Sequence, residues 1–360
     1  MKIAVFHNFL DNMGGAEFVS LVMARELNAD IYTTNIDEDK IGKMGFGVDN
    51  IYSIGNVPLN APFRQELAYW KFRKLNFKDK YDFYIIAGDW ALSGAVHNKP
   101  NLWYVHSPIR EIWDLYYYVR QNIVDFHKRF LFDIWVFFRR LLNRWDSKKA
   151  GKIIANSKNV QKRIKRYLNK DSIVIYPPVE TSKYLYTRNG DFWLSVNRLI
   201  DHKRVDLQIK AFSELPHEKL IIVGSYERSE HFQKYAKYIE KIRPQNVMIL
   251  NWINQEKLIN LYANCKGFIA TSIDEDYGLA PVEAMASGKP VIAPNEGGYK
   301  ETVIDGITGK LIDNIDIKKL KKAVKKVGKN PERYKEACLK QAKKFDTEIF
   351  VKKIMEIIKC

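Results

Sequence analysis

Short apolar runs of four or five residues recur along the chain, and segments with helical spacing of their apolar positions separate them. Runs of this length are typical of strands that are buried on both faces of a parallel sheet. Strands that alternate with helices predict right-handed crossover units. In the first half, strands are predicted over residues 3–7, 30–34, 50–54, 83–87, 102–105, 152–156 and 173–176. In the second half they are predicted over residues 193–196, 220–223, 247–250, 267–270, 291–293 and 309–312.

A linker is predicted near the middle of the chain. Pro177 and Pro178 are followed by a polar segment over residues 181–191, and proline pairs and polar segments separate domains. A chain of 360 residues with 46% hydrophobic residues is long enough for two cores. We therefore expect two doubly wound domains, over residues 1–180 and 190–340. In such sheets, ligands bind beyond the carboxyl ends of the strands.

The segment over residues 273–301 combines a loop, a short helix and a strand. Pro281 suits the first turn of a helix, where its missing N–H group costs nothing, and Gly288 suits the residue after the helix. We therefore expect a helix over residues 279–287. Its unpaired N–H groups and its dipole favour an anion at its N-terminus, and Gly278 lets the backbone approach that ligand closely.

Two carboxylates flank the start of this predicted helix. Glu275 lies in the loop before the helix, and Glu283 lies about one turn inside it. Both can face one ligand, and a carboxylate accepts hydrogen bonds from the vicinal hydroxyls of a sugar or a ribose. The alternative is that Glu283 only complements the helix dipole and that Glu275 is a solvated loop acid, since this spacing alone is common.

This region resembles the E-x7-E region of retaining glycosyltransferases of family 4, and the resemblance extends over nearly the whole chain. It implies an α/β fold of the GT-B type, in which two doubly wound Rossmann-like domains face each other across a cleft. On this resemblance Glu275 holds the hydroxyls of the donor sugar near the reacting carbon, and Glu283 accepts from the ribose hydroxyls. Tyr277, Gly278 and Leu279 are expected to bind the donor nucleotide.

Two cations follow the strand predicted over residues 193–196. Arg198 and Lys203 lie between that strand and a helical pattern over residues 205–215, which puts them in a loop above a sheet. Cations there can neutralise a diphosphate, arginine in a bidentate way and lysine as a point charge. Ordinary surface charge is the alternative in so lysine-rich a chain, but the pattern is similar to the Arg-x4-Lys diphosphate site of the family.

Two further matches lie in the first half. Gly14 and Gly15 form a strand-to-helix turn that lets the backbone approach a phosphate or a sugar, although a tight turn alone explains them equally well. His106 follows a predicted strand in a segment similar to the H-[ST]-P stretch of family members that act on envelope polysaccharides. The resemblance makes His106 an active-site residue, whereas a lone histidine is more often structural. It also implies that a helix over residues 341–360 packs back on the first domain.

The resemblance implies transfer of a hexose from a nucleotide sugar to an acceptor hydroxyl, with retention at the anomeric carbon. Mannose from GDP-mannose is the preferred donor, and a glycan or a lipid-linked molecule is the expected acceptor. We expect no cofactor and no metal, so Arg198 and Lys203 carry the charge of the leaving diphosphate. The acidic triplets over residues 37–39 and 274–276 are interpreted as a solvated loop and as part of the sugar site.

The chain is strongly basic, with 59 Lys and Arg residues, 42 Asp and Glu residues and a formal net charge of +17. Such a balance favours anionic partners. Residues 108–170 hold 16 of these cations against 5 acids, interleaved with aromatic residues. This segment predicts contact with an anionic membrane surface, with amphipathic helices whose aromatic residues belong to the core as the alternative.

The three cysteines have no metal-ligand spacing, which predicts reduced thiols. The first residues read as a strand rather than a signal peptide, so we expect a cytoplasmic protein, peripheral on the inner face of the cell membrane. One rival hypothesis is a nucleotide-sugar epimerase or a phosphorylase of the same shape, which needs no separate acceptor. Another is a nucleic-acid-binding protein, but no recognition motif accompanies the charge, so no nucleic acid is expected.

Overall fold

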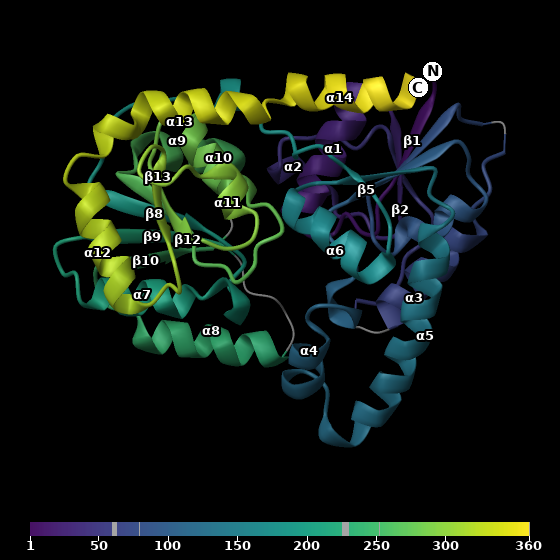
Figure 1. Cartoon of the computed structure of the whole chain (residues 1–360), viewed down its shortest axis with the longest axis horizontal. Coiled ribbons are helices and arrows are strands. Elements are labelled where there is room, and N and C mark those ends of the chain that lie inside the picture. The colour runs from purple at the N-terminus through teal and green to yellow at the C-terminus, as the bar shows by residue number, and fades with distance from the viewer. Residues whose placement is uncertain (60–62, 79, 225–229, 252, 360) are drawn as a thin grey trace. The chain divides into compact units, whose positions relative to one another are not determined.

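The computed structural model describes residues 1–59, 63–78, 80–224, 230–251 and 253–359. The chain divides into two compact units. The N-terminal unit comprises Met1–Tyr176 and Val351–Cys360, and the C-terminal unit comprises Pro177–Phe350. In each unit, helices alternate with the strands of one parallel sheet and cover it (Figure 1). The α/β fold class that the hydrophobic pattern predicts is therefore confirmed.

The sheet of the N-terminal unit has seven strands in the order β3-β2-β1-β4-β5-β6-β7. Every neighbouring pair in it is parallel. The strands are β1 (Ile3–Phe6), β2 (Asp30–Thr33), β3 (Ile51–Ser53), β4 (Phe83–Ile86), β5 (Asn101–Val105), β6 (Lys152–Ala155) and β7 (Ile173–Val174). The central strands β1, β4 and β5 are buried along their whole length, as their continuous apolar sequences require.

The N-terminal unit has a core rich in aromatic side chains. The ring of Phe6 packs on the rings of Tyr84 and Phe72, with centroids 5.7 and 5.9 Å apart. The α-helices of the unit are α1 (Gly15–Leu27), α2 (Glu38–Lys43), α3 (Phe63–Lys74), α4 (Tyr116–Asn122), α5 (Arg129–Ser147) and α6 (Lys158–Leu168). Both α3 and α5 pack on a short 3-10 helix, η1 (Ala91–Val96), that follows β4.

The sheet of the C-terminal unit has six strands in the order β10-β9-β8-β11-β12-β13. They are β8 (Phe192–Val196), β9 (Lys219–Val223), β10 (Val247–Leu250), β11 (Gly267–Ile269), β12 (Val291–Pro294) and β13 (Gly309–Ile312), and all neighbours are parallel. All thirteen predicted strands are thus present, each within two residues of its predicted ends.

Helices cover both faces of this second sheet. They are α7 (Val205–Ser213), α8 (Glu230–Ile242), α9 (Gln255–Asn264), α10 (Leu279–Ala286), α11 (Tyr299–Thr302), α12 (Ile317–Gly328) and α13 (Lys335–Ala342). Figure 1 shows α9 and α10 on one side of the sheet and α7 and α8 on the other. This arrangement buries the continuous apolar run of β12 from both sides.

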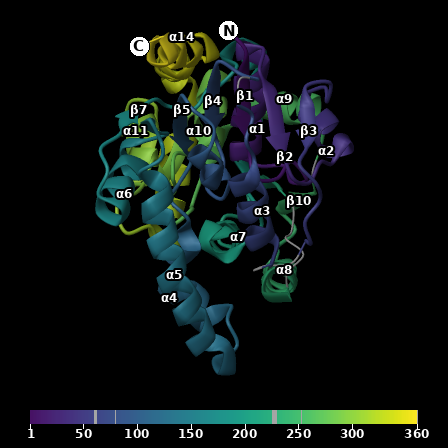
Figure 2. The ribbon, with the colours of Figure 1, turned by 90° about the vertical axis from the view of Figure 1, so that its right-hand side faces the viewer.

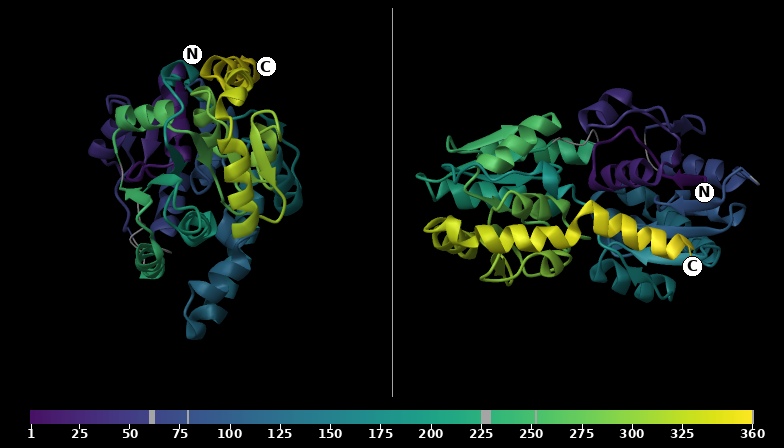
Figure 3. Two further views of the ribbon diagram at one scale, coloured as in Figure 1. Left: turned by 90° about the vertical axis from the view of Figure 1, so that its left-hand side faces the viewer. Right: turned by 90° about the horizontal axis from the view of Figure 1, so that it is seen from above.

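The last helix, α14 (Thr347–Lys359), begins in the C-terminal unit, and its residues from Val351 onward belong to the N-terminal unit. It follows α13 in the yellow part of the chain (Figure 3). Within the N-terminal unit, the Lys152 ammonium donates a hydrogen bond to the carbonyl of Ile357, at 2.8 Å. A cation near the C-terminal end of a helix is favourable, because the unpaired carbonyls there carry partial negative charge.

Two histidines lie side by side at the carboxyl ends of β1 and β5. The rings of His7 and His106 meet edge to face, with centroids 6.4 Å apart. His7 is buried, and its Nδ1 lies 3.0 Å from the Ser20 hydroxyl. Burial lowers the pKa of His7 to about 3, with a further contribution from His106, and burial lowers the pKa of His106 to about 4. Both imidazoles are therefore neutral at pH 7.

Acid should destabilise the N-terminal unit. Unfolded histidines take up a proton near pH 6.5, whereas His7 and His106 in the folded unit do so only near pH 3 and 4. The unfolded state therefore binds more protons below pH 6.5, so stability is complete above that pH and falls as the pH drops toward 4. We expect a loss of roughly 1–2 kcal/mol per histidine between pH 7 and pH 5.

Urea unfolding followed by tryptophan fluorescence measures this loss, because six of the eight tryptophans belong to the N-terminal unit. A His7→Asn variant should lose less stability between the two pH values than the unchanged chain. His127 is exposed, so the control variant His127→Asn should behave like the unchanged chain. An equal loss in the His7→Asn variant and the unchanged chain would contradict the prediction.

Candidate active site

Three neighbouring strands of the C-terminal unit end at the same edge of the sheet. In the strand order, β8, β11 and β12 are adjacent, and because they are parallel, the loops that follow them emerge together. These loops cover residues 197–204, 270–278 and 295–298. The predicted donor-binding residues of the second half lie in the first two loops or in the helix that follows the second, so the sheet topology brings these segments together.

The central contact of this edge joins two of the predicted residues. The ammonium of Lys203 lies 2.6 Å from Oε2 of Glu275, and their side chains are only 14% and 19% exposed. The hydroxyl of Tyr299 lies 3.5 Å from the same carboxylate oxygen. Burial, followed by the charge of Glu275, raises the pKa of Tyr299 well above its usual range, so the hydroxyl stays protonated and donates. Lys203 and Glu275, which are 72 residues apart, therefore belong to one site.

Arg204 connects the three loops, although it is not among the residues predicted for the site. Its backbone is left-handed, with φ of 51°. Its guanidinium donates to the carbonyls of Thr271 and Ser272, at 2.5 and 3.2 Å, and to the carboxylate of Glu296. The Thr271 hydroxyl donates in return to the carbonyl of Lys203, at 2.7 Å. A second cation directly after Lys203 was the only signal in the sequence.

Two glycines let the third loop lie directly against the loop of Glu275. The Gly298 amide donates to the Glu275 carbonyl at 2.8 Å. A Cβ atom on Gly297 would lie 2.5 Å from the same carbonyl oxygen, so a larger residue does not fit. The backbone of Glu275 is therefore held from one side by Gly297 and Gly298, while its side chain reaches Lys203.

The loop of Glu275 leads into the N-terminus of α10. Gly278 precedes the helix with φ of 89°, a conformation that glycine adopts without strain. Tyr277 is buried and packs against the ring of Phe345, with centroids 5.9 Å apart. Leu279 is the first residue of the helix, and Gly288 follows its last turn with φ of 68°, as the sequence predicts. The first N–H groups of α10 therefore follow the Glu275 loop directly.

Glu283 has different surroundings from Glu275. It is the fifth residue of α10, and its Oε2 accepts a hydrogen bond from the Tyr262 hydroxyl at 2.7 Å. The hydroxyl of Tyr184 also bonds to this carboxylate. Burial raises the pKa of Glu283, and the two tyrosines oppose this rise. The structure thus brings Glu283 to a pair of buried tyrosines, and its contact with a ribose stays a prediction.

Arg198 lies in the loop after β8, with an exposed side chain. Its carbonyl accepts a hydrogen bond from the amide of Ile200 at 3.0 Å, within a tight turn that leads to Lys203. The turn keeps Arg198 on the same loop as Lys203 and at the same edge of the sheet. Its contact with a diphosphate stays a prediction.

The remaining predicted residues belong to the N-terminal unit. Gly14 caps α1 with an extended backbone, and Gly15 is the first residue of the helix. The Glu17 carboxylate lies directly over Gly14, where a Cβ atom would collide with it. His106 follows β5, and its Nε2 is buried without a hydrogen-bond partner in the part of the chain that the structure describes. His7, which the sequence analysis passed over, is its neighbour.

A buried arginine lies next to the segment of His106. Arg163 of α6 is 6% exposed and donates to the Ser107 hydroxyl at 3.1 Å. It also lies 3.8 Å from Asp114, which pairs with Arg110 at 2.7 Å. A buried cation with polar partners holds the loop after β5 in place. Arg163 lies in a lysine-rich helix, so the sequence does not distinguish this buried arginine from exposed cations.

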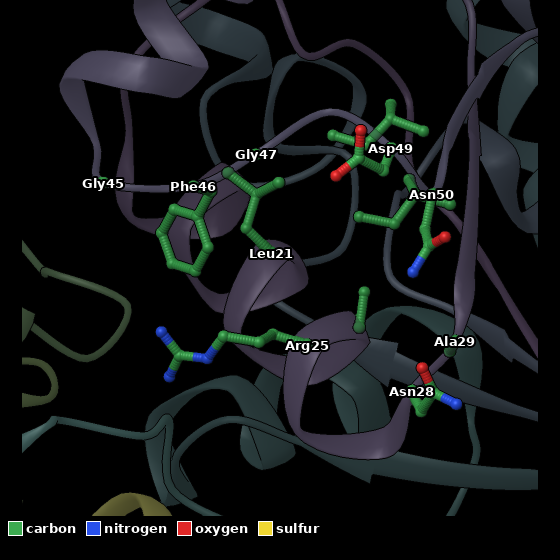
Figure 4. Close-up of a pocket in the computed structure, with 12 residues that line it drawn as sticks. Leu21, Arg25, Asn28, Ala29, Gly45, Phe46, Gly47, Asp49 and Asn50 are labelled. Carbon is green, nitrogen blue, oxygen red and sulfur yellow. The ribbon is translucent and has the colours of Figure 1, made fainter.

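A cavity of about 320 Å³ lies elsewhere in the N-terminal unit, between α1 and the chain that leads into β3 (Figure 4). Leu21, Arg25, Phe46 and Asp49 are among its lining residues, and none of the predicted site residues lines it. Among the described residues, no group of three or more His, Cys, Asp or Glu side chains is arranged to hold a metal ion. No helix among them is long and apolar enough to cross a bilayer.

Two family models match the chain. The model described as "Glycosyl transferases group 1" matches residues 181–345, and the model described as "Glycosyltransferase Family 4" matches residues 13–183. The first match covers the loops of Lys203, Arg204 and Glu275, and the second covers Gly14, Gly15 and His106. The two models therefore meet near the boundary between the units.

The chain is also similar to curated proteins. It is 29% identical over 225 residues to alpha-1,3/1,6-mannosyltransferase ALG2 of Dictyostelium discoideum, which is 51% of this chain and 53% of that protein. It is 29% identical over 196 residues to the uncharacterized glycosyltransferase MJ1178 of Methanocaldococcus jannaschii, 54% of each chain. The chain thus spans about half the length of these curated relatives.

Solved structures share the fold over the whole chain. Anabaena HepE in complex with UDP-glucose superposes with a TM-score of 0.77 at 19% identity, over 100% of this chain and 99% of the other. Sucrose-phosphate synthase of Thermosynechococcus elongatus superposes with a TM-score of 0.76 at 16% identity, over 99% and 98%. The two family models together match residues 13–345 and show that the chain belongs to the family 4 glycosyltransferases, and the solved structures show that it has the GT-B fold.

Proposed function

We propose that the protein transfers a hexose from a nucleotide sugar to an acceptor hydroxyl, with retention at the anomeric carbon. The contact between the Lys203 ammonium and the Glu275 carboxylate is the observation that carries this proposal. It joins a cation suited to a diphosphate and a carboxylate suited to sugar hydroxyls, beside the N-terminus of α10. A sugar diphosphate requires a cation at its diphosphate and a hydrogen-bond acceptor at its sugar, and this site provides both.

The proposed chemistry begins with an exchange of partners. The oxygens of a bound diphosphate compete with Glu275 for Lys203, and the released carboxylate then accepts from the hydroxyls of the donor sugar. Arg198, Lys203 and the first N–H groups of α10 stabilise the charge that develops on the leaving diphosphate. The leaving phosphate oxygen takes the proton of the acceptor hydroxyl, so no side chain is needed as general base. The proposed transfer uses no metal, because Arg198 and Lys203 carry the charge of the diphosphate.

GDP-mannose is the proposed donor. Mannosyltransferases of Dictyostelium discoideum and Candida glabrata are among the curated relatives, at 29% and 28% identity, and this favours mannose. The HepE structure holds UDP-glucose at 19% identity, so a uridine donor is the competitor to test. The pair of Tyr262 and Glu283 offers a carboxylate for the ribose hydroxyls of either nucleotide.

The proposed acceptor is a glycan or a lipid-linked molecule, reached at the inner face of the cell membrane through residues 108–170. One curated relative is the poly(glycerol-phosphate) alpha-glucosyltransferase of Bacillus subtilis, at 30% identity. A structural neighbour is described as a lipopolysaccharide outer core galactosyltransferase, WaaB, with a TM-score of 0.67. One name describes a polymer of glycerol phosphate, which is anionic and suits a chain of net charge +17, and the other describes a lipid-linked polysaccharide.

A calorimetric titration tests the donor site first. We expect one nucleoside diphosphate among GDP, UDP and ADP to bind without metal, with GDP as the tightest. Lys203→Ala should weaken this binding and lower kcat by roughly 100-fold, because it removes charge stabilisation from the leaving group. Lys219→Ala is the matched control, since Lys219 forms an exposed ion pair with Asp191 at the other end of the sheet. Binding only with magnesium, or less than a threefold loss of kcat, would contradict the proposed role of Lys203.

Glu275→Gln separates sugar binding from nucleotide binding. The substitution keeps the shape of the side chain but removes the charge that now pairs with Lys203. Transfer should be abolished, whereas the affinity for the nucleoside diphosphate should be unchanged or higher, because Lys203 no longer has a competing partner. Product formation with and without acceptor measures transfer and also detects the epimerase alternative. Near-normal transfer by this variant would overturn the assigned role.

Arg204 is predicted to be a positioning residue for the same reaction. Arg204→Gly suits the left-handed backbone but removes the hydrogen bonds to Thr271 and Ser272. We expect kcat to fall roughly 10- to 100-fold with little change in KM for the acceptor, since the loops lose their relative placement. Asn314→Gly is the matched control, because Asn314 is also left-handed but follows β13. Unchanged kcat in Arg204→Gly would show that the loops keep their geometry without the guanidinium.

A further inference from the structure

The helices α4 and α5 form a hairpin in the N-terminal unit with many exposed apolar side chains. A single-turn 3-10 helix, η3 (Phe126–Lys128), precedes α5. Figures 1 and 2 show this turn at the end of the hairpin that is far from the sheet of its own unit. Phe126 in the turn is 83% exposed, Phe130 at the start of α5 is 72% exposed, and Tyr117 in α4 is 71% exposed. Phenylalanines as exposed as these are unusual, because burying such a ring is strongly favourable.

The exposed residues of α5 form one continuous row, here called the apolar stripe. Successive members are one, three or four positions apart, in an order that places all of them on one side of the helix. The stripe consists of Phe130, Leu131, Ile134, Phe137, Phe138, Leu141 and Trp145. Its length is about 22 Å, at 1.5 Å of rise per residue. A surface of this size is larger than scattered single exposed residues explain.

The opposite side of α5 is already occupied. Val136 is buried in the core of the N-terminal unit, and Phe132, Trp135 and Leu142 pack against that core. The Trp135 ring stacks on the ring of Trp90, with centroids 6.3 Å apart, and its indole N–H donates to Glu66 at 2.7 Å. The apolar stripe therefore lies on a second apolar side of α5, and its residues do not pack in the core of the N-terminal unit.

The hairpin is held rigidly. Asp133 of α5 accepts from the Tyr116 hydroxyl at 2.6 Å and from the Arg120 guanidinium through both of its oxygens, at 2.8 and 2.9 Å. The Arg129 guanidinium donates to the carbonyl of Gln121 at 2.8 Å. Bidentate, charge-assisted contacts of this kind fix one geometry. The apolar stripe is thus presented by a built element and not by a loose loop.

The charges around the stripe favour one class of partner. Residues 116–149 hold eight Lys and Arg residues and three Asp residues, and one of the cations, Arg139, is buried on the other side of α5 against Glu66. Each of the three acids pairs with a cation: Asp125 with Lys128, Asp133 with Arg120 and Asp146 with Arg73. Arg144 and Lys148 at the end of α5 are exposed. A cationic rim beside exposed aromatic rings matches an anionic interface, whereas a second copy of the hairpin would bring like charges together.

We propose that the hairpin of α4 and α5 docks the protein on an anionic lipid bilayer. Phe126, Phe130 and the adjacent part of the apolar stripe enter the boundary between headgroups and acyl chains, and the basic rim contacts the lipid phosphates. The hairpin lies in the interface and does not span it, because the other side of α5 stays on the core of its unit. The proposal assigns the membrane contact predicted for residues 108–170 to this hairpin alone. Binding of the hairpin to lipid requires neither the sugar donor nor the acceptor.

Co-sedimentation of the full chain with vesicles tests the proposal. We expect binding to vesicles of phosphatidylcholine with phosphatidylglycerol, weaker binding to phosphatidylcholine alone, and a loss of binding in high salt. The double variant Phe126→Ser/Phe130→Ser should bind at least about tenfold more weakly, since it removes the most exposed rings. The control Ile173→Ser/Ile307→Ser removes two apolar side chains that are exposed elsewhere, and should bind as the unchanged chain does.

Three results would overturn the proposal: no binding of the unchanged chain to anionic vesicles, equal binding of the Phe126→Ser/Phe130→Ser variant, or a dimer that this variant dissociates while vesicles stay unbound. The last result would assign the stripe to a second copy. A Phe126→Trp variant keeps an aromatic ring at the turn, and brominated lipids should quench it more than they quench the unchanged chain. Nucleotide binding is measured separately, so its failure leaves this test intact.

Discussion

The guanidinium of Arg204 holds together the loops that form the candidate active site. Its left-handed backbone costs about 1–2 kcal/mol, but a charge-assisted hydrogen bond contributes about 1.5–3 kcal/mol, and Arg204 donates to two carbonyls and a carboxylate. The balance therefore favours the strained conformation. With the loops fixed in this way, Lys203 and Glu275 meet at 2.6 Å although they come from different strand ends. Both side chains therefore already lie at one edge of the sheet before a substrate binds, where the proposed exchange of partners takes place.

The two carboxylates before and within α10 have different electrostatic surroundings. Glu275 is paired with an ammonium, so it competes with any anion that approaches Lys203. Glu283 has two tyrosine hydroxyls as partners, and burial raises its pKa. The first environment suits an exchange of ionic partners, and the second suits hydrogen bonding to neutral hydroxyls. Their different partners thus support the different roles proposed for them.

In the N-terminal unit, the two sides of the helix α5 likewise have different surroundings. One side is buried against aromatic residues of the core, and the opposite side carries the apolar stripe. The aromatic residues of α5 thus lie on two different sides of the helix. The alternative of a helix whose aromatic residues belong to the core describes the buried side, and the proposed membrane contact uses the exposed side. The cationic rim distinguishes the exposed side, since the three acids of the hairpin are already paired.

The hydrophobic pattern by itself determined the thirteen strands, the α/β class and the short helix that starts at Leu279, because buried strands and helix ends have local sequence requirements. The motif spacing also placed Lys203 and Glu275 at strand ends. Only the tertiary structure decided which side chains meet. Contacts with residues far along the chain determine the environments of Arg204, Tyr299, His7 and Arg163. The lysine-rich or apolar sequence around these residues does not indicate such contacts. Contacts of this kind depend on strand order and loop packing, which residues close in sequence do not encode.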